Sequence, residues 1–282
     1  MILFKHSKDL HSYLDRIRIS KNPVGFVPTM GALHKGHLSL IDQCKSQAKV
    51  TVCSIFVNPT QFNNPDDFKK YPVTIEKDIQ LLEEHGCDIL FLPDEKEMYP
   101  DAASKDQYFD LGYLETILEG KFRPGHFQGV CLIVEKLLTI INPDKLFIGQ
   151  KDFQQCLVIK KLIEIDRLKT EVVIAPILRE ENGLAMSSRN TRLSSAERNL
   201  ASELYHSLQF IKNHLTNSNF NELRNEKISY LENLGFKVDY LELANTKNLR
   251  LTDKFEKNKS NICLIAAYLN DVRLIDNLII NM

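Results

Sequence analysis

The sequence predicts an α/β fold: a doubly wound parallel sheet with a smaller C-terminal α+β domain. Up to about residue 175, short apolar runs typical of buried strands alternate with amphipathic helical segments, a spacing typical of right-handed βαβ units. Beyond that point two helical segments precede an antiparallel hairpin pattern. Because 282 residues are many for one domain, we predict two domains, at residues 1–177 and 178–282.

Five apolar runs predict the strands of the first domain. The clearest is 50–57, a continuous β-branched and apolar run that ends before an Asn-Pro pair and is typical of a strand buried on both faces. The remaining strands are predicted at 24–28, 88–92, 146–148 and 171–174.

Helical segments fill the intervals between these strands. In segment 74–85, Ile75, Ile79 and Leu82 share one side, charged residues occupy the others, and Gly86 closes the helix. Further helices are predicted after the first strand, ending near residue 48, and in the segments 111–118, 130–141 and 153–165.

The C-terminal part has α+β organisation. Ser194 and Glu197 form a capping-box pattern that opens a helix running towards His214, and a second helix is predicted at 221–233. Residues 237–243 alternate as a strand does, and 262–269 is expected to pair with 272–275 across an Asn-Asp turn.

The composition is that of an ordinary soluble globular protein, with 43% apolar residues, 26% charged residues and a net charge of −1. This balance argues against nucleic acid or an anionic membrane as the main partner. Six scattered cysteines without a Cys-x-x-Cys pair are expected to be buried in the protein interior. They indicate a reducing compartment. The N-terminal residues lack a signal-peptide pattern and no run approaches the roughly 18 apolar residues of a membrane span, so we expect a cytoplasmic protein.

Four polar motifs follow the predicted carboxyl ends of four strands, at 30–37, 58–63, 149–155 and 178–190. In an open parallel sheet these ends form the crevice where ligands bind. Each motif taken alone is also compatible with a surface turn or a helix cap. Their shared position favours a single binding site.

The first motif has the chemistry of an anion site. His34 and His37 are three residues apart and can share one side of a first helical turn. Gly31 and Gly36 would let a phosphate or a flat base approach the backbone. N–H donors at a helix N-terminus stabilise charge on a phosphate, so imidazolium groups here would suit a nucleotide.

The other motifs add complementary groups. Gln61 and Gln155 are neutral amides that can hold a carboxylate or hydroxyl without adding charge. Lys151 is a point charge suited to phosphate, while Asp152 is equally compatible with a helix cap. The segment 186–190 contains two hydroxyls and a guanidinium, which suit a triphosphate.

Taken together, these segments resemble the pantothenate synthetase family. They are PTMGALHKGH at 28–37, FVNPTQF at 56–62, GQKDFQQ at 149–155 and MSSRN at 186–190. The resemblance runs from about residue 20 to residue 277 and includes RPGHF at 123–127 and RLIDN at 273–277. The His-x-Gly-His element alone would indicate only the broader class of nucleotidyl-transferring Rossmann-like folds.

The resemblance implies a Rossmann-like domain that binds ATP and pantoate, and a C-terminal domain that covers the active site. The implied reaction is the ATP-dependent condensation of (R)-pantoate with β-alanine to pantothenate, through pantoyl-adenylate, with release of pyrophosphate and AMP. It further implies Mg²⁺ with the triphosphate and a homodimer. The magnesium ligands stay open, Asp78 being one candidate.

Site residues follow from the resemblance position by position. His34, His37, Lys151 and Arg189 are expected to be catalytic, with His37 at the position that the family treats as the catalytic acid. Gln61 and Gln155 are expected to hold pantoate, and Gln61 also to lie near β-alanine. The residues expected to contact ATP are Met30, Gly31, Ala32, Leu33, His34, Lys35, Gly36, His37, Gly149, Gln150, Lys151, Asp152, Leu178, Met186, Ser187, Ser188 and Arg189.

Two positions depart from the pattern, since Gln150 stands where we expect glutamate and Leu178 where we expect valine. Two other functions stay open at this point. One is a dinucleotide-forming or other nucleotidyl-transferring enzyme, which would give the two glutamines no role. The other is a non-catalytic nucleotide or RNA sensor, which the net charge of −1 does not favour.

Overall fold

The computed structural model describes residues 1–101, 107–216, 219–255 and 259–280. The chain divides into two compact units: unit 1 is Met1–Gly149 with Val158–Pro176, and unit 2 is Gln150–Leu157 with Ile177–Met282. The segment Gln150–Leu157 packs with unit 2, whereas a division at residue 178 would leave it in the first domain. The side chain of Asn277 contributes to this packing, because it bonds the backbone carbonyls at the start of the segment.

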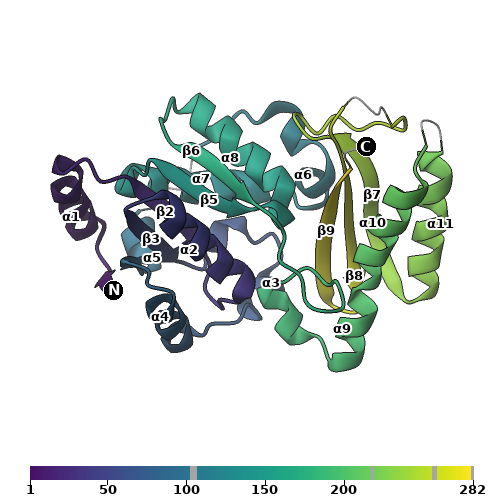
Figure 1. Ribbon diagram of the computed structural model, residues 1–282, viewed down its shortest axis with the longest axis horizontal. Helices are drawn as coiled ribbons and strands as arrows, with labels where there is room; N and C mark the ends of the chain where they lie inside the picture. Colours follow the sequence, from purple (N-terminus) through teal and green to yellow (C-terminus); the bar gives the residue numbers. More distant parts are fainter. Residues whose placement is uncertain (102–106, 217–218, 256–258, 281–282) are drawn as a thin grey trace. The chain divides into compact units, whose positions relative to one another are not determined.

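Unit 1 contains a six-stranded parallel sheet with the order β1-β4-β3-β2-β5-β6. Figure 1 labels four of its strands, β2, β3, β5 and β6. Its strands are β1 (Ile2–Phe4), β2 (Val24–Thr29), β3 (Val50–Ile55), β4 (Ile89–Phe91), β5 (Lys145–Gly149) and β6 (Glu171–Ala175). After β2 the chain adds β3 and β4 on one side and then β5 and β6 on the other. The order therefore reverses between β2 and β5, and such a switch point is where open α/β sheets bind ligands at the carboxyl ends of their strands.

The helices of unit 1 alternate with these strands, which confirms the predicted α/β organisation. They are α1 (Ser7–Ile19), α2 (Lys35–Gln47), α3 (Pro65–Lys69), α4 (Ile75–Glu84), α5 (Glu95–Met98), α6 (Leu118–Phe122), α7 (His126–Ile141) and the greater part of α8 (Phe153–Ile165), with 3₁₀ turns η1 (Pro59–Gln61) and η3 (Gly112–Glu115). The prediction of one helix over 111–118 is wrong. Gly112 and Leu118 both have positive φ, +55° and +44°, so the segment forms a 3₁₀ turn before the short α6.

An apolar cluster joins α2 and α4 to the sheet of unit 1. It includes Leu40, Ile41 and Leu82 from the helices and Val27 and Phe147 from the strands. The cysteines are all free and buried, as their apolar neighbours predict. Burial raises the pKa of the Cys44 thiol to about 11. Within the described ranges, no helix is both long and apolar enough to cross a membrane.

Unit 2 is built on an antiparallel sheet with the order β7-β8-β9. Its elements are β7 (Phe236–Asn245), β8 (Asn261–Leu269), β9 (Val272–Ile280), α9 (Ser195–Ala201), α10 (Glu203–His214) and α11 (Phe220–Asn233), with the 3₁₀ turns η4 (Gln150–Asp152) and η5 (Ser188–Arg192). Figure 1 shows α10 and α11 side by side along this sheet, and both contribute to one apolar core with it. The hairpin turns at Asn270, with φ +52°, and Asp271, where the sequence predicts it.

The capping box at the start of α9 is confirmed, because Ser194 Oγ accepts from Glu197 N at 3.3 Å and Glu197 Oε2 accepts from Ser194 N at 2.7 Å. The prediction of a single helix to His214 is wrong, because the helix is interrupted at Ser202. There the hydroxyl donates to Asn199 O at 2.7 Å and competes with the regular helical bonding.

Candidate active site

The turn between β2 and α2 is held by a carboxylate from another element. Gly31 and Ala32 have φ values of +79° and +49°, and a positive φ is unusual for alanine. Asp78 of α4 is fully buried, and its carboxylate accepts from Ala32 N and Leu33 N, both at 2.8 Å. Thr74 Oγ1 donates to the same carboxylate at 3.1 Å. Asp78 therefore fixes the strained backbone on which the first motif depends.

The two histidines cap the helix that follows. His34 is the N-cap of α2, and its Nδ1 accepts from Gly36 N at 3.1 Å, while His37 Nδ1 accepts from His34 N at 3.4 Å. The two rings lie 4.0 Å apart between centroids. A ring nitrogen that accepts a hydrogen bond carries no proton, so this geometry favours the tautomer with the proton on Nε2. In that tautomer each ring has an Nε2–H donor.

The second motif meets the first within unit 1. Gln61, in the turn η1 after β3, places its Nε2 3.1 Å from Met30 Sδ. Asn58 Nδ2 donates to Gln61 Oε1 at 3.2 Å and to Gly129 O at 3.1 Å. His126 Nδ1 lies 2.8 Å from Gln61 O, at the first turn of α7. Bonds to both the side chain and the backbone thus hold the amide of Gln61 beside the histidine turn.

The third motif begins at the end of β5 and continues as η4 in unit 2. Gly149 is the last residue of β5, and the Nζ of Lys151 lies 3.8 Å from Asp152 Oδ2. Gln150 Nε2 donates to Asn277 Oδ1 at 3.0 Å, so glutamine supplies here a donor that the expected glutamate lacks. Gln155 is partly exposed on α8.

The fourth motif forms a compact loop in unit 2. Arg179 and Ala185 make an antiparallel bridge, and Met186 N donates to Leu178 O at 3.0 Å, which brings Leu178 and Met186 together. Leu178 is 40% exposed. Buried Asn190 Nδ2 donates to Ala185 O at 3.1 Å and so closes the loop.

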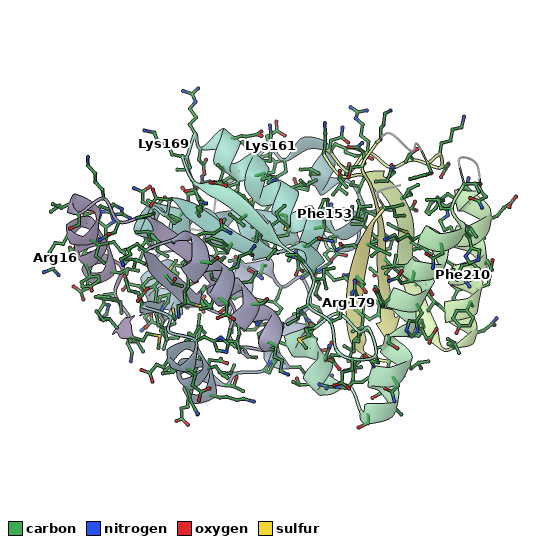
Figure 2. The ribbon with its side chains drawn as sticks, viewed as in Figure 1. Arg16, Phe153, Lys161, Lys169, Arg179 and Phe210 are labelled. Carbon is green, nitrogen blue, oxygen red and sulfur yellow. The ribbon has the colours of Figure 1, made fainter. Side chains whose placement is uncertain are left out.

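The hydroxyls and the guanidinium of this motif lie in η5. Ser187 is its N-cap and accepts from Arg189 N at 3.3 Å, while Ser188 is buried and Arg189 is partly exposed. Figure 2 shows that Arg179, at the other end of the loop, lies differently from the surface residue Lys169. Lys169 extends away from the ribbon, whereas Arg179, with a side chain only 16% exposed, lies beside the strands of unit 2.

Comparison with known proteins decides the family. The model of the family described as Pantoate-beta-alanine ligase matches residues 2–279. The chain belongs to the pantoate-beta-alanine ligase family. It is 45% identical to the pantothenate synthetase of Cytophaga hutchinsonii over 284 residues, 99% of each chain.

Two solved structures share the fold of this pantoate-beta-alanine ligase family member. The crystal structure of the Thermus thermophilus pantothenate synthetase matches with a TM-score of 0.91 and 35% identity over 100% of both chains. The Francisella tularensis pantoate-beta-alanine ligase, complexed with Beta-gamma ATP and Beta-alanine, matches with a TM-score of 0.83 and 39% identity. That match covers 99% of this chain and 97% of the relative.

Sequence reasoning missed the residues that support the site. Asn58, His126 and Asn277 lie inside motifs that carry the family resemblance, but nothing in the motifs indicates what they bond. The sequence offers Asp78 as a magnesium candidate, yet it also carries a signal for this supporting role. Asp78 stands between Ile75 and Leu82 on the apolar side of its helix, and a carboxylate at such a position needs a buried partner.

Proposed function

We propose that this family member activates (R)-pantoate with ATP and transfers the acyl group to β-alanine. A carboxylate oxygen of pantoate attacks the α-phosphorus of ATP, which gives pantoyl-adenylate and pyrophosphate. The amine of β-alanine then attacks the acyl carbon, and AMP leaves as pantothenate forms. The family model and the Francisella relative solved with Beta-gamma ATP and Beta-alanine support this reaction.

The observation that carries the proposal is the contact between Gln61 and Met30 in unit 1. It gives the turn expected to bind ATP a neutral neighbour that can both donate and accept hydrogen bonds. A substrate carboxylate or hydroxyl can be held there without a further charge beside the phosphates. Such a group suits an enzyme that activates an acid, whereas a dinucleotide-forming enzyme would give it no role.

Site roles are proposed on the same basis. His34 and His37 of unit 1 donate hydrogen bonds to the phosphates, and Lys151 and Arg189 of unit 2 neutralise and orient them, since phosphoryl-type transfer needs mainly positioning and charge stabilisation. Gln155 acts with Gln61 on pantoate. The intermediate is already activated towards the amine, so the second step needs no covalent enzyme intermediate.

Magnesium and the dimer are also proposals. Mg²⁺ would accompany the triphosphate, whose oxygens are its usual ligands. Asp78 is not assigned to the metal, because both of its carboxylate oxygens accept from backbone or hydroxyl donors in unit 1. The family resemblance supports a homodimer in the cytoplasm, and light scattering on the purified chain tests the dimer.

Isotope exchange separates the candidate functions. We expect exchange of labelled pyrophosphate into ATP that depends on pantoate, followed by AMP release only after β-alanine is added. A dinucleotide-forming enzyme would exchange labelled pyrophosphate into ATP when a nucleotide acceptor is present, and would not require pantoate. A sensor would bind ATP and exchange nothing.

His37→Ala tests the first motif. Loss of one donor that acts in the transition state costs about 3 kcal/mol, roughly a hundredfold in rate, so we expect at least about a tenfold fall in turnover. The melting temperature should be nearly unchanged, because the cap contact of His37 with His34 N is long, at 3.4 Å. The exposed His206 provides a matched control as His206→Ala. Near-wild-type turnover in folded His37→Ala would contradict the role.

Gln61→Ala tests the pantoate contact. We expect weaker pantoate binding with ATP binding retained, because a substrate polar group would lose its partner. Calorimetry with each ligand measures both affinities. An equal loss for ATP and pantoate would refute the assignment.

A further inference from the structure

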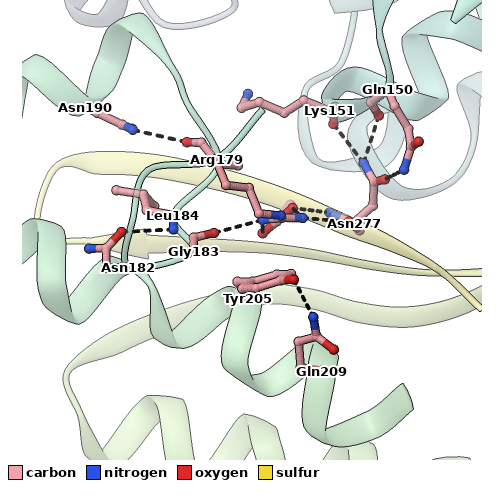
Figure 3. A network of polar contacts seen from close by, with 12 residues as sticks. Gln150, Lys151, Arg179, Asn182, Gly183, Leu184, Asn190, Tyr205, Gln209 and Asn277 are labelled. Atoms are coloured by element: carbon pink, nitrogen blue, oxygen red, sulfur yellow. Dashed lines mark hydrogen bonds and ion pairs between the residues drawn. The ribbon is translucent and has the colours of Figure 1, made fainter. Parts of the chain in front are cut away.

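Asn277 is a buried residue of β9 that bonds the backbone of the third motif. Its side chain is 1% exposed, and its Nδ2 donates to Gln150 O at 2.9 Å and to Lys151 O at 3.0 Å. Its Oδ1 accepts from Gln150 Nε2 at 3.0 Å. In Figure 3 the Lys151 side chain runs away from Asn277, so the asparagine holds the backbone at Lys151 and not its ammonium group.

The preceding residue, Asp276, is bonded to the fourth motif. It is 4% exposed, and its carboxylate accepts from Arg179 Nη1 at 2.6 Å and Nη2 at 2.9 Å. The guanidinium also donates to Gly183 O at 3.0 Å and to Asn277 O at 3.3 Å, and it lies 3.8 Å from the ring centroid of Tyr205. Arg179 is thereby fixed at the base of the loop that carries Leu178 and Met186 to Arg189.

Burying the ion pair of Asp276 and Arg179 has an electrostatic cost. Burial raises the pKa of Asp276, while the bond and charge of Arg179, the backbone N–H of Asn277 and the charge of Lys151 act in the opposite direction. A bidentate arginine is the partner that makes such a buried carboxylate tolerable. Successive side chains of a strand point to opposite faces, so two adjacent residues of β9 can reach two different segments.

We propose that Asp276 and Asn277 together position the two segments of unit 2 expected to contact ATP, and that Asn277 acts on the ligase reaction through Lys151. The inference rests on the proposed role of Lys151. Neither residue needs to touch a substrate. Their contribution is to fix the backbone from which Lys151 and the loop 186–189 extend, and small displacements of such groups lower rates strongly.

A double-mutant cycle in the full chain tests this. Asn277→Asp keeps the shape of the side chain but places a carboxylate oxygen against the carbonyls of Gln150 and Lys151. We expect pantoate-dependent pyrophosphate exchange to fall by about tenfold or more in kcat. In a Lys151→Ala background the same change should cost less than about twofold, because the group that it positions is gone.

Controls separate the possible failures. Asn225→Asp, the same chemical change at an exposed position of α11, should leave exchange unaltered. If Asn277→Asp does not fold, as judged by its thermal transition, Asn277→Ser replaces it in the same cycle, since a hydroxyl retains one donor. Multiplicative effects of the two substitutions, or wild-type kcat in the Asn277 variants, would overturn the inference. Absence of pantoate-dependent exchange in the wild-type chain would instead overturn the proposed function.

Discussion

Asp78→Asn should destabilise unit 1 although it changes a single atom. The carboxylate has two oxygens, one bonded to Ala32 N and the other to Leu33 N, both at 2.8 Å. Asparagine keeps one oxygen and turns an NH₂ group towards the other backbone N–H. One buried donor then loses its acceptor and meets another donor.

The magnitude follows from these contacts. A hydrogen bond to a charged group contributes about 1.5–3 kcal/mol, and a buried donor left without a partner costs about 1–3 kcal/mol. We therefore expect Asp78→Asn to lower the free energy of unfolding by about 2–3 kcal/mol. Turnover should fall with it, because the turn at Ala32, with φ +49°, loses one of the two bonds that hold it.

Urea unfolding followed by linear extrapolation measures the change, with pyrophosphate exchange assayed on the same preparations. Glu83→Gln is the matched control, since this carboxylate is exposed on the same helix and its loss should stay within about 0.5 kcal/mol. An Asp78→Asn protein with the stability and turnover of the wild type would refute the account of the turn.

Two further predictions concern packing and pH. In Gly129→Ala the new Cβ would lie against Thr60 O and 2.7 Å from Gln61 N. We therefore expect the free energy of unfolding in urea to fall by about 1–3 kcal/mol and pantoate to bind more weakly. The control is Gly149→Ala, whose Cβ would meet nothing within 4 Å and which should leave the stability nearly unchanged. Hydrogen bonds from Ser7 lower the pKa of Glu97 to about 2, so its ionised form contributes stability above pH 4.5 that is lost as the pH falls towards 2. Allowing for solvent screening, Glu97→Gln should reduce the difference in unfolding free energy between about pH 6 and about pH 3 by about 1 kcal/mol, and an unchanged difference would contradict this.

The parts of the fold that the sequence predicts are those set by local chemistry. The run at Val50–Ile55 needs both faces buried, and the box of Ser194 and Glu197 satisfies helix N-terminal donors within four residues. The failures also have local causes that a periodicity does not reveal. The left-handed Leu118 interrupts one predicted helix and the hydroxyl of Ser202 another.

The candidate site likewise has contacts that the sequence predicts and contacts that it does not. The approach of Gln61 to Met30 follows from two adjacent parallel strands, β2 and β3, that end at one edge of the sheet. The supporting residues depend instead on contacts between distant positions. Asp78 is 46 residues from Ala32, and Asn277 is 127 residues from Gln150, so no local pattern could pair them.

The chemical type of each supporting residue nevertheless follows from the backbone that it serves. The turn at Ala32 presents buried N–H groups, which need an acceptor, and the residue that meets them is an aspartate. The 3₁₀ turn at Lys151 presents carbonyl groups, which need a donor, and the residue there is an asparagine. Asp78→Asn and Asn277→Asp should therefore both disrupt the backbone that they contact, for opposite reasons. The first substitution places an amide donor against a backbone N–H donor, and the second places a carboxylate acceptor against carbonyl acceptors.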